Sequence, residues 1–252
     1  MSVVAPTGMS MRGIRAMFAE QWRRLPKSEI AGTVEIVGSS FLADEPTIFG
    51  AVNEEYVQRE LDWYESESLK VADIPGGPPK IWQQVAGHNG QINSNYGALL
   101  FSPDNYRQYD RVLENLTKRP NGRQAVAIYM RPSMHVEWDF EGKKDFVCTW
   151  GVNYFLRDGA VHAVVMMRSQ DAVFGYRNDY AWQKHVLDKL VADLNERGVG
   201  QTPPYEGIVP AIQAGAIVWQ AASLHVYERH FHLIEHYDRT GEYDVSLSVG
   251  RS

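Results

Sequence analysis

The sequence FVCTWGVNYFL at residues 146–156, followed by AVHAVVMM at residues 160–167, decides the fold because it predicts two consecutive β-strands. Both segments are rich in valine or aromatic residues, which suit the pleated and half-buried surface of a sheet. The tripeptide Arg157-Asp158-Gly159 between them is a hairpin turn signal, since Asp-Gly tolerates the positive φ angles of a two-residue turn. The sequence therefore predicts an antiparallel hairpin over residues 146–167.

The only cysteine of the chain, Cys148, lies in the first of these strands. With the two turn residues in place and no bulge, Cys148 falls opposite Ser169 and beside Arg168. A nearby cation lowers the pKa of a thiol and favours the nucleophilic thiolate. The alternative is an inert thiol beside a structural arginine, because cysteine is among the most often buried residue types.

Helical and extended patterns alternate on both sides of this hairpin. The predicted helices span residues 10–24, 53–64, 102–118 and 180–196; further strands span 33–38, 125–131 and 214–227, and a helical segment follows the last strand. In the helix over 102–118, Ser102 is the cap, Pro103 takes the first position, and the apolar stripe comprises Tyr106, Tyr109, Val112, Leu113 and Leu116. Helices mixed with antiparallel strands, without a clear linker, predict a single α+β domain over residues 1–252.

Composition and charge describe an ordinary globular protein of 252 residues, with 44% hydrophobic and 22% charged residues. The formal net charge of −6 provides no broad basic field for nucleic acids or anionic membranes. A single cysteine excludes a disulfide within the chain and fits a reducing compartment, so we expect a cytoplasmic protein. The N-terminal sequence lacks the apolar core of a secretory signal, and no apolar run approaches the roughly 20 residues of a membrane helix.

Glu60 is the anomaly of the helix predicted over residues 53–64. Its face of the helix is otherwise apolar, with Val57, Leu61 and Tyr64 at helical spacing. A carboxylate that faces a core is costly unless it is paired or protonated. A functional Glu60 would have a raised pKa and could transfer protons. The alternatives are a rotated helix that brings Glu60 to solvent, or a buried arginine partner.

Four histidines, His225, His230, His232 and His236, follow one another near the C-terminus. Although their spacing invites a metal site, no cysteine or obvious carboxylate completes a familiar ligand pattern, and we predict no bound metal. His225 and Tyr227 are two residues apart in a predicted strand, so both side chains point to the same face and can bond one polar ligand.

The sequence contains no phosphate-binding loop of the triphosphate or dinucleotide type, which disfavours those nucleotide sites. Arginine side chains can bind phosphate instead, because their planar guanidinium groups match its oxygens. The candidates are Arg123, Arg131 and Arg168, and the alternative for each is an ordinary surface arginine.

Taken together, these residues resemble the thymidylate synthase family, and more closely its deoxycytidylate hydroxymethylase branch. The similarity covers most of residues 34–232 and runs in the order of the family. It rests on VEIVGSSFLADEPTIFGAVNEEYVQRELDWY (34–64), KIWQQVAGHNGQINSNYG (80–97), YMRPSM (129–134), DFVCTWGVNYFLRDG (145–159), MRSQDAVFGYRNDYAWQKHVLDKLVADL (167–194) and IVWQAASLHVYERHF (217–231).

The resemblance implies a mechanism. Cys148 matches the nucleophile that adds to carbon 6 of a pyrimidine, after which carbon 5 attacks the methylene group of 5,10-methylenetetrahydrofolate. Glu60 matches the glutamate that handles protons, and Tyr96 matches the tyrosine that helps to remove the proton from carbon 5. Trp82 matches a tryptophan beside the folate, and Asp171 matches the aspartate that holds its pterin.

The resemblance also implies how the nucleotide is bound. Arg168 and Ser169 match phosphate ligands, while His225 and Tyr227 match the pair that bonds the sugar hydroxyl.

The family fold that the resemblance implies is a three-layer α+β domain with a mixed β-sheet that forms the interface of a homodimer. Arg123 matches one of two adjacent arginines that reach the partner's phosphate, so each active site is expected to be shared. The second arginine is replaced by Gln124 in this chain, which removes one charged contact. Lys27 is only a candidate for the phosphate-binding cation that the family carries near the N-terminus.

Asp179, in YRNDYAW, matches the asparagine that reads uracil in thymidylate synthases. A carboxylic acid can accept from the amino group of cytosine and donate to its ring nitrogen, and an ionised carboxylate fits a protonated ring, so Asp179 favours cytosine. The alternative role is a helix N-cap, and both roles could coexist. The C-terminal SLSVGRS (246–252) does not resemble the apolar closing tail of the synthases, which favours hydroxymethylation over methylation.

The sequence thus predicts a cytidylate 5-hydroxymethyltransferase, with dCMP as the favoured substrate and CMP, the substrate of relatives in nucleoside antibiotic biosynthesis, as a close second. One alternative is a thymidylate synthase or dUMP hydroxymethylase, which Asp179 disfavours. Another is a non-catalytic nucleotide- or RNA-binding member of the fold, which the presence of Cys148 and Glu60 disfavours. The expected partners are a pyrimidine nucleoside monophosphate, the folate co-substrate and a second copy of the chain, without nucleic acid or membrane.

Overall fold

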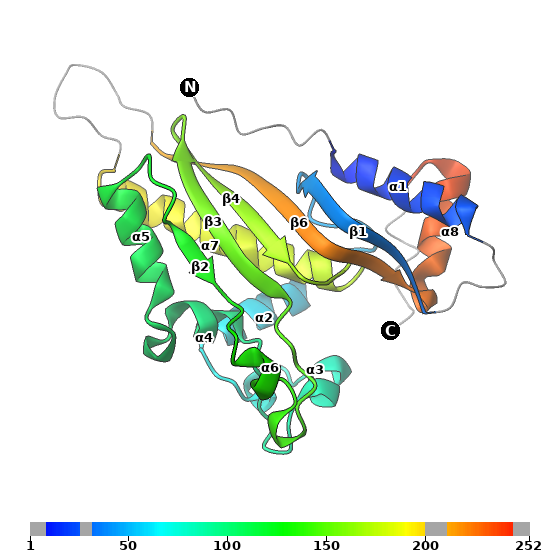
Figure 1. The fold of residues 1–252 in the computed structure, drawn as a ribbon, viewed down its shortest axis with the longest axis horizontal. Helices are drawn as coiled ribbons and strands as arrows, with labels where there is room; N and C mark the ends of the chain where they lie inside the picture. The colour runs from blue at the N-terminus through cyan, green and yellow to red at the C-terminus, as the bar shows by residue number, and fades with distance from the viewer. Residues whose placement is uncertain (1–8, 26–31, 200–210, 244–252) are drawn as a thin grey trace. The chain divides into compact units, whose positions relative to one another are not determined.

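The computed structural model describes residues 9–25, 32–199 and 211–243 of the chain. Its helices and strands are α1 (Met11–Arg24), β1 (Thr33–Leu42), α2 (Glu54–Glu65), α3 (Lys80–Val85), α4 (Tyr96–Phe101), α5 (Gln108–Lys118), β2 (Val126–Ile128), α6 (Met134–Glu137), β3 (Thr149–Arg157), β4 (Ala160–Met167), β5 (Gln170–Asp171), α7 (Gly175–Glu196), β6 (Gln213–Tyr227) and α8 (Phe231–Thr240) (Figure 1). No helix in the described ranges is long and apolar enough to cross a membrane.

The contacts within the chain group it into two compact units. Unit 1 comprises residues 1–53, 164–185 and 216–252, and unit 2 comprises residues 54–163 and 186–215. Both units draw on β4, α7 and β6, whose residues are divided between them. The single domain expected over the whole chain remains a prediction.

The strands form hydrogen bonds in the order β1-β6-β4-β3-β2, with β5 beside β6. β1 is antiparallel to β6, with Val34 opposite Val226, and β2 is antiparallel to β3, with Ala127 opposite Val152. All four of these side chains are fully buried. Because β5 runs parallel to β6, the sheet is mixed, as predicted.

The predicted hairpin is confirmed at its turn between β3 and β4. Asp158 and Gly159 have φ angles of 50° and 77°, and two positive φ angles are what a two-residue type I′ turn requires. β3 begins at Thr149, so Cys148 lies directly before the strand and not inside it, as the prediction over 146–156 had it. Just before this segment, the backbone carbonyl of Asp145 accepts a hydrogen bond from the side chain of Asn93.

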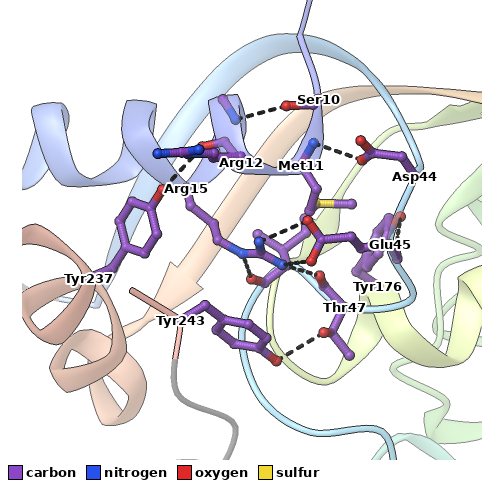
Figure 2. Close-up of polar contacts among 12 residues, drawn as sticks. Ser10, Met11, Arg12, Arg15, Asp44, Glu45, Thr47, Tyr176, Tyr237 and Tyr243 are labelled. Atoms are coloured by element: carbon purple, nitrogen blue, oxygen red, sulfur yellow. Dashed lines mark hydrogen bonds and ion pairs between the residues drawn. The ribbon is translucent and has the colours of Figure 1, made fainter. Parts of the chain in front are cut away.

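Unit 1 is held around a buried arginine, Arg15 of α1, which is 4% exposed. Its guanidinium group bonds the Glu45 carboxylate at 3.0 and 2.6 Å and donates to the carbonyl oxygens of Thr47 and Ile48 (Figure 2). The ring of Tyr243 lies 4.3 Å from the guanidinium carbon. Removing a charged group from water costs free energy. A two-pronged ion pair together with further hydrogen-bond acceptors can offset this cost. α1, which matches the helix predicted over residues 10–24, also packs along α8 (Figure 1).

The helix predicted over residues 102–118 is interrupted, so this prediction was wrong in part. Ser102 caps a short 3₁₀ turn, but Tyr106 and Arg107 have φ angles of 62° and 48° and separate that turn from α5. Tyr106 is 83% exposed and does not belong to the apolar stripe, whose other four members are buried. The break allows the Gln108 amide to bond the backbone of both α4 and β2, a long-range contact that overrides the local helical pattern.

Other elements differ from the predictions mainly in length. α7 begins five residues earlier than expected, β1 extends beyond its predicted end at residue 38, and β2 is shorter than the predicted 125–131. α3, α4 and α6 were not predicted, because helices of six residues or fewer are too short to show a helical period. The helix expected after the last strand is confirmed as α8.

In unit 2, α2 and α4 approach each other closely at Gly97. An ideal Cβ atom on this residue would lie 1.7 Å from the carbonyl oxygen of Tyr64. The approach brings the rings of Tyr64 and Tyr96 to a centroid distance of 5.4 Å. Only a residue without a side chain allows α4 to begin at this place.

Replacing Gly97 with alanine is expected to lower the free energy of unfolding by about 3 kcal/mol or more, because the added methyl group must displace backbone atoms. As a control, alanine at Gly13 in α1 meets only the side chain of Met9, and a change of less than about 1 kcal/mol is expected. Urea unfolding of both variants measures the difference. A Gly97→Ala protein as stable as the wild type would contradict the close approach.

Candidate active site

Cys148 lies in unit 2, partly exposed, in the segment that leads into β3. Its Sγ is 3.8 Å from the carbonyl oxygen of Phe146, the length of a weak thiol hydrogen bond. The next residue, Thr149, is fully buried and donates its hydroxyl hydrogen to the Tyr96 oxygen at 3.0 Å. The structure therefore brings Tyr96 to the segment that carries the thiol.

Asp145 joins these same two segments. Its buried carboxylate accepts hydrogen bonds from the backbone N–H groups of Asn93 and Ser94, at 2.6 and 2.7 Å, and from the Ser94 hydroxyl at 2.6 Å. The side chain of Asn93 donates in return to the Asp145 carbonyl oxygen at 2.8 Å. Burial raises the pKa of Asp145, and the hydrogen bonds from Ser94 and the backbone counteract this effect. The residues before Tyr96 and those before Cys148 are thereby fixed to each other.

Asn95 determines where α4 begins. Its Oδ1 caps the helix by accepting from the backbone N–H of Ala98 at 2.8 Å. Its Nδ2 donates to the carbonyl oxygens of Trp63 and Ser68 at 3.1 and 2.9 Å, so the fully buried amide is bonded at both ends. Tyr96 is thereby fixed as the first residue of α4.

Glu60 of α2 is 4% exposed, which confirms the predicted burial of this carboxylate. Its Oε1 accepts hydrogen bonds from the Tyr56 hydroxyl at 2.8 Å and from Nε1 of Trp82 at 3.1 Å. Burial, together with the adjacent Glu60, raises the pKa of Tyr56, which keeps this hydroxyl protonated as a donor. The structure therefore places Trp82, the predicted folate neighbour, in contact with the predicted proton carrier.

In unit 1, the parallel pairing of β5 and β6 sets Asp171 beside His225. The Asp171 carboxylate accepts from the backbone N–H groups of Val173 and Phe174 at 2.9 and 3.4 Å, which fixes its direction. His225 and Tyr227 lie close together as predicted, with ring centroids 4.9 Å apart. Burial lowers the pKa of His225, although Asp171 acts in the opposite direction.

Asp179 is the fifth residue of α7, which begins at Gly175, so its alternative role as a helix N-cap is excluded. Its Oδ2 accepts a hydrogen bond from Nε2 of Gln170 at 2.8 Å. Gln170 lies in β5 and is only 2% exposed.

The predicted anion ligands lie in different surroundings. Arg168 and Ser169 directly follow β4 in unit 1 and are partly exposed. Arg123 is exposed in the loop before β2, in unit 2. Arg131 forms an ion pair with Glu137 through Nε and Nη2, while its buried Nη1 has no hydrogen-bond partner among the described residues.

Within residues 9–25, 32–199 and 211–243, no group of three or more histidine, cysteine, aspartate or glutamate side chains could hold a metal ion. His230 is buried with its ring against that of Phe174, at a centroid distance of 4.7 Å. Lys27 and the C-terminal tail over 246–252 lie outside the described residues.

Several contributors to these groups were not predicted from the sequence, among them Tyr56, Asp145 and Gln170. Tyr56 lies four residues before Glu60 on α2, a spacing that could have indicated the contact. Asp145 precedes Cys148 by three residues, but its partners lie about fifty residues away, and no local signal reveals them. Gln170 carried a weaker signal as a polar residue between two candidate ligands, Ser169 and Asp171.

Comparison with known proteins identifies the family of this chain. A sequence model of the thymidylate synthase family matches residues 50–248. The deoxycytidylate 5-hydroxymethyltransferase of Enterobacteria phage T4 is 56% identical over 214 residues, which covers 85% of this chain and 83% of the relative. The enzyme of the same name from phage T6 is 56% identical over 210 residues, covering 83% and 82%. A thymidylate synthase from Bacillus subtilis subsp. natto is 23% identical over 180 residues, covering 68% and 57%.

The fold agrees with a solved structure as well. The thermostable thymidylate synthase A from Bacillus subtilis superimposes with a TM-score of 0.65 at 15% identity, covering 92% of this chain and 84% of that one. At this identity the likeness concerns the fold alone, and it confirms the predicted α+β architecture. The match over residues 50–248 and the high identity to the phage proteins show more: the chain belongs to the thymidylate synthase family.

Proposed function

We propose that this chain is a cytidylate 5-hydroxymethyltransferase, which adds a hydroxymethyl group to carbon 5 of dCMP with 5,10-methylenetetrahydrofolate and water as co-substrates. The observation that carries the proposal is the 56% identity, over 85% of the chain, to phage proteins named for this reaction on deoxycytidylate. Cys148, Glu60 and Asp179, which the reaction on cytosine requires in this proposal, are all present. CMP is the second candidate substrate.

The chemistry begins with the Cys148 thiolate, which adds to carbon 6 of the cytosine ring and makes carbon 5 nucleophilic. Carbon 5 forms a bond to the one-carbon unit, the folate nitrogen leaves, and the hydrogen on carbon 5 departs as a proton with the help of Tyr96. Water then adds to the resulting methylene group, and the thiolate is expelled from carbon 6. Methylenetetrahydrofolate supplies carbon at the oxidation level of formaldehyde, so the sum of these steps needs neither an oxidant nor a reductant.

Glu60 is assigned the transfer of protons in this sequence of steps. Both donors that contact its Oε1, the Tyr56 hydroxyl and the Trp82 indole, are neutral groups. Hydrogen bonds from such donors fix the direction in which the carboxylate points. The role that we assign to this carboxylate is to accept a proton and return it during the reaction.

The folate co-substrate is assigned to Trp82 and Asp171, each of which has the chemistry for one part of it. The indole of Trp82 is partly exposed and packs edge-on against Trp63, with centroids 5.3 Å apart, which leaves an aromatic surface for a planar pterin. The carboxylate of Asp171 is oriented by the backbone of the loop that follows it and can accept from pterin N–H groups.

The nucleotide is assigned to Asp179 at the base, His225 and Tyr227 at the sugar, and Arg168 and Ser169 at the phosphate. Asp179 accepts well from the amino group of cytosine, whereas uracil would place a carbonyl oxygen against it. This preference argues against a thymidylate synthase or a dUMP hydroxymethylase. The cysteine and the buried glutamate argue against a non-catalytic binding protein.

A homodimer with shared active sites completes the proposal. Ile128 and Trp150, on the neighbouring strands β2 and β3, are 59% and 49% exposed, which is unusual for large apolar side chains of a sheet. Arg123 is exposed in the loop before β2, where it could serve a partner's phosphate. Light scattering on the purified protein tests the homodimer, because the measured molar mass should be twice that of one chain.

The reactive thiol favours a reducing compartment, in keeping with a cytoplasmic location.

Purified protein is expected to release tritium from carbon 5 of labelled dCMP when methylenetetrahydrofolate is present. Glu60→Gln should lower this rate by about 10²–10⁴-fold, because the amide retains an acceptor for Tyr56 and Trp82 but cannot carry a proton. Glu55→Gln, at an exposed position of the same helix, is the control and should leave the rate unchanged. No release by the wild type from dCMP, CMP or dUMP would favour the non-catalytic alternative.

Asp179→Asn is expected to reverse the choice of base, since an asparagine amide can donate and accept as uracil requires. The ratio of kcat/KM for dCMP to that for dUMP should fall by about 10²-fold or more. Side-by-side assays of both nucleotides measure this ratio. A variant that keeps the full wild-type preference would show that another residue reads the base.

A further inference from the structure

Gln170 is a buried polar residue to which the proposed reaction gives no role. It is 2% exposed, and its backbone is fixed by the parallel pairing of β5 with β6, opposite Leu224. Its Nε2 donates to Oδ2 of Asp179 at 2.8 Å, while its Oε1 is buried and has no hydrogen-bond partner among the described residues. An unpaired carbonyl oxygen in a protein interior is costly, so the presence of a glutamine here calls for an explanation, and its hydrogen bond to Asp179 offers one.

The first residue of α7 is a glycine, which leaves room for this hydrogen bond. Gly175, the first residue of the helix, has no side chain, and an ideal Cβ there would lie 3.1 Å from Nε2 of Gln170 and 3.9 Å from Oδ2 of Asp179. A Cβ contact of 3.1 Å is tighter than most real Cβ contacts, so a larger residue would press on the donor. The glycine therefore leaves the space in which the amide reaches the carboxylate.

The bond has two consequences for Asp179. A hydrogen bond to an ionised oxygen stabilises the charged form of a carboxyl group. A fixed donor on Oδ2 also fixes the rotation of the carboxylate, so that Oδ1 keeps one direction. An oriented and charged oxygen accepts from an amino group and repels a carbonyl oxygen, which is the difference between cytosine and uracil at position 4 of the ring.

We propose that Gln170 is a specificity-determining positioning residue, which holds Asp179 as an oriented carboxylate and thereby strengthens the preference for cytosine over uracil. This inference rests on the proposed function, in which Asp179 reads the base. Gln170 acts through Asp179 and does not itself touch the nucleotide.

The test compares binding of dCMP and dUMP to the full-length protein by titration calorimetry, without folate. Gln170→Met keeps the length and approximate volume of the side chain but removes the donor. The ratio of the dUMP dissociation constant to that of dCMP should fall by about tenfold or more, the scale of one hydrogen bond to a charged group. Gln183→Met is the matched control, because Gln183 is a fully buried glutamine of α7 whose amide atoms have no partner among the described residues. The ratio of the dUMP to the dCMP dissociation constant in Gln183→Met should remain within about twofold of the wild-type ratio.

A folded Gln170→Met protein with the wild-type ratio would overturn the inference, and so would an equal fall in Gln183→Met, which would indicate general loosening of the unit. If Gln170→Met does not fold, Gly175→Ala replaces it, since the added methyl group presses on the same donor and should lower the ratio in the same direction. An unchanged ratio in that variant would count against the inference. A wild type that shows no preference for dCMP and releases no tritium from it would instead refute the proposed function.

Discussion

The hydrogen bonds to the buried Asp145 carboxylate are the constraint on which unit 2 depends. They join residues 93 and 94 to the segment just before Cys148, although about fifty residues of chain separate the two. The first of these segments continues through Asn95 into α4, and the second continues into β3. The hydrogen bond from the Thr149 hydroxyl to the Tyr96 oxygen joins the same two segments again, at the residue next to Cys148. Tyr96 and Cys148 are therefore placed by one set of interactions.

The carboxylates of this protein accept hydrogen bonds from two kinds of donor, charged and neutral. The buried guanidinium group of Arg15 pairs with the partly exposed carboxylate of Glu45 within unit 1. Glu60 and Asp179 instead receive hydrogen bonds from neutral groups of tyrosine, tryptophan and glutamine side chains. Each of these hydrogen bonds orients the carboxylate that accepts it.

Features with a local cause were predictable from the sequence. The Asp158-Gly159 turn, the burial of Glu60 and the proximity of His225 to Tyr227 follow from short-range rules of turn chemistry and side-chain periodicity, and all three are confirmed. The break at Tyr106 was not predictable, because it depends on bonds from Gln108 to two other elements. Asp145 and Gln170 were missed because their roles depend on partners that only the folded chain brings near. The residue roles carried over by resemblance remain proposals.

The most direct test of the account is the mass of the intact protein after incubation with 5-fluoro-dCMP and methylenetetrahydrofolate. The hydrogen on carbon 5 of dCMP leaves as a proton, but fluorine at the same position cannot leave as a cation. The reaction should therefore stop with nucleotide and folate both bound covalently to the protein through Cys148. The account predicts a mass increase equal to the sum of the two molecules in the wild type and none in Cys148→Ala. The same adduct in Cys148→Ala, or no adduct in a wild-type protein that turns over dCMP, would contradict it.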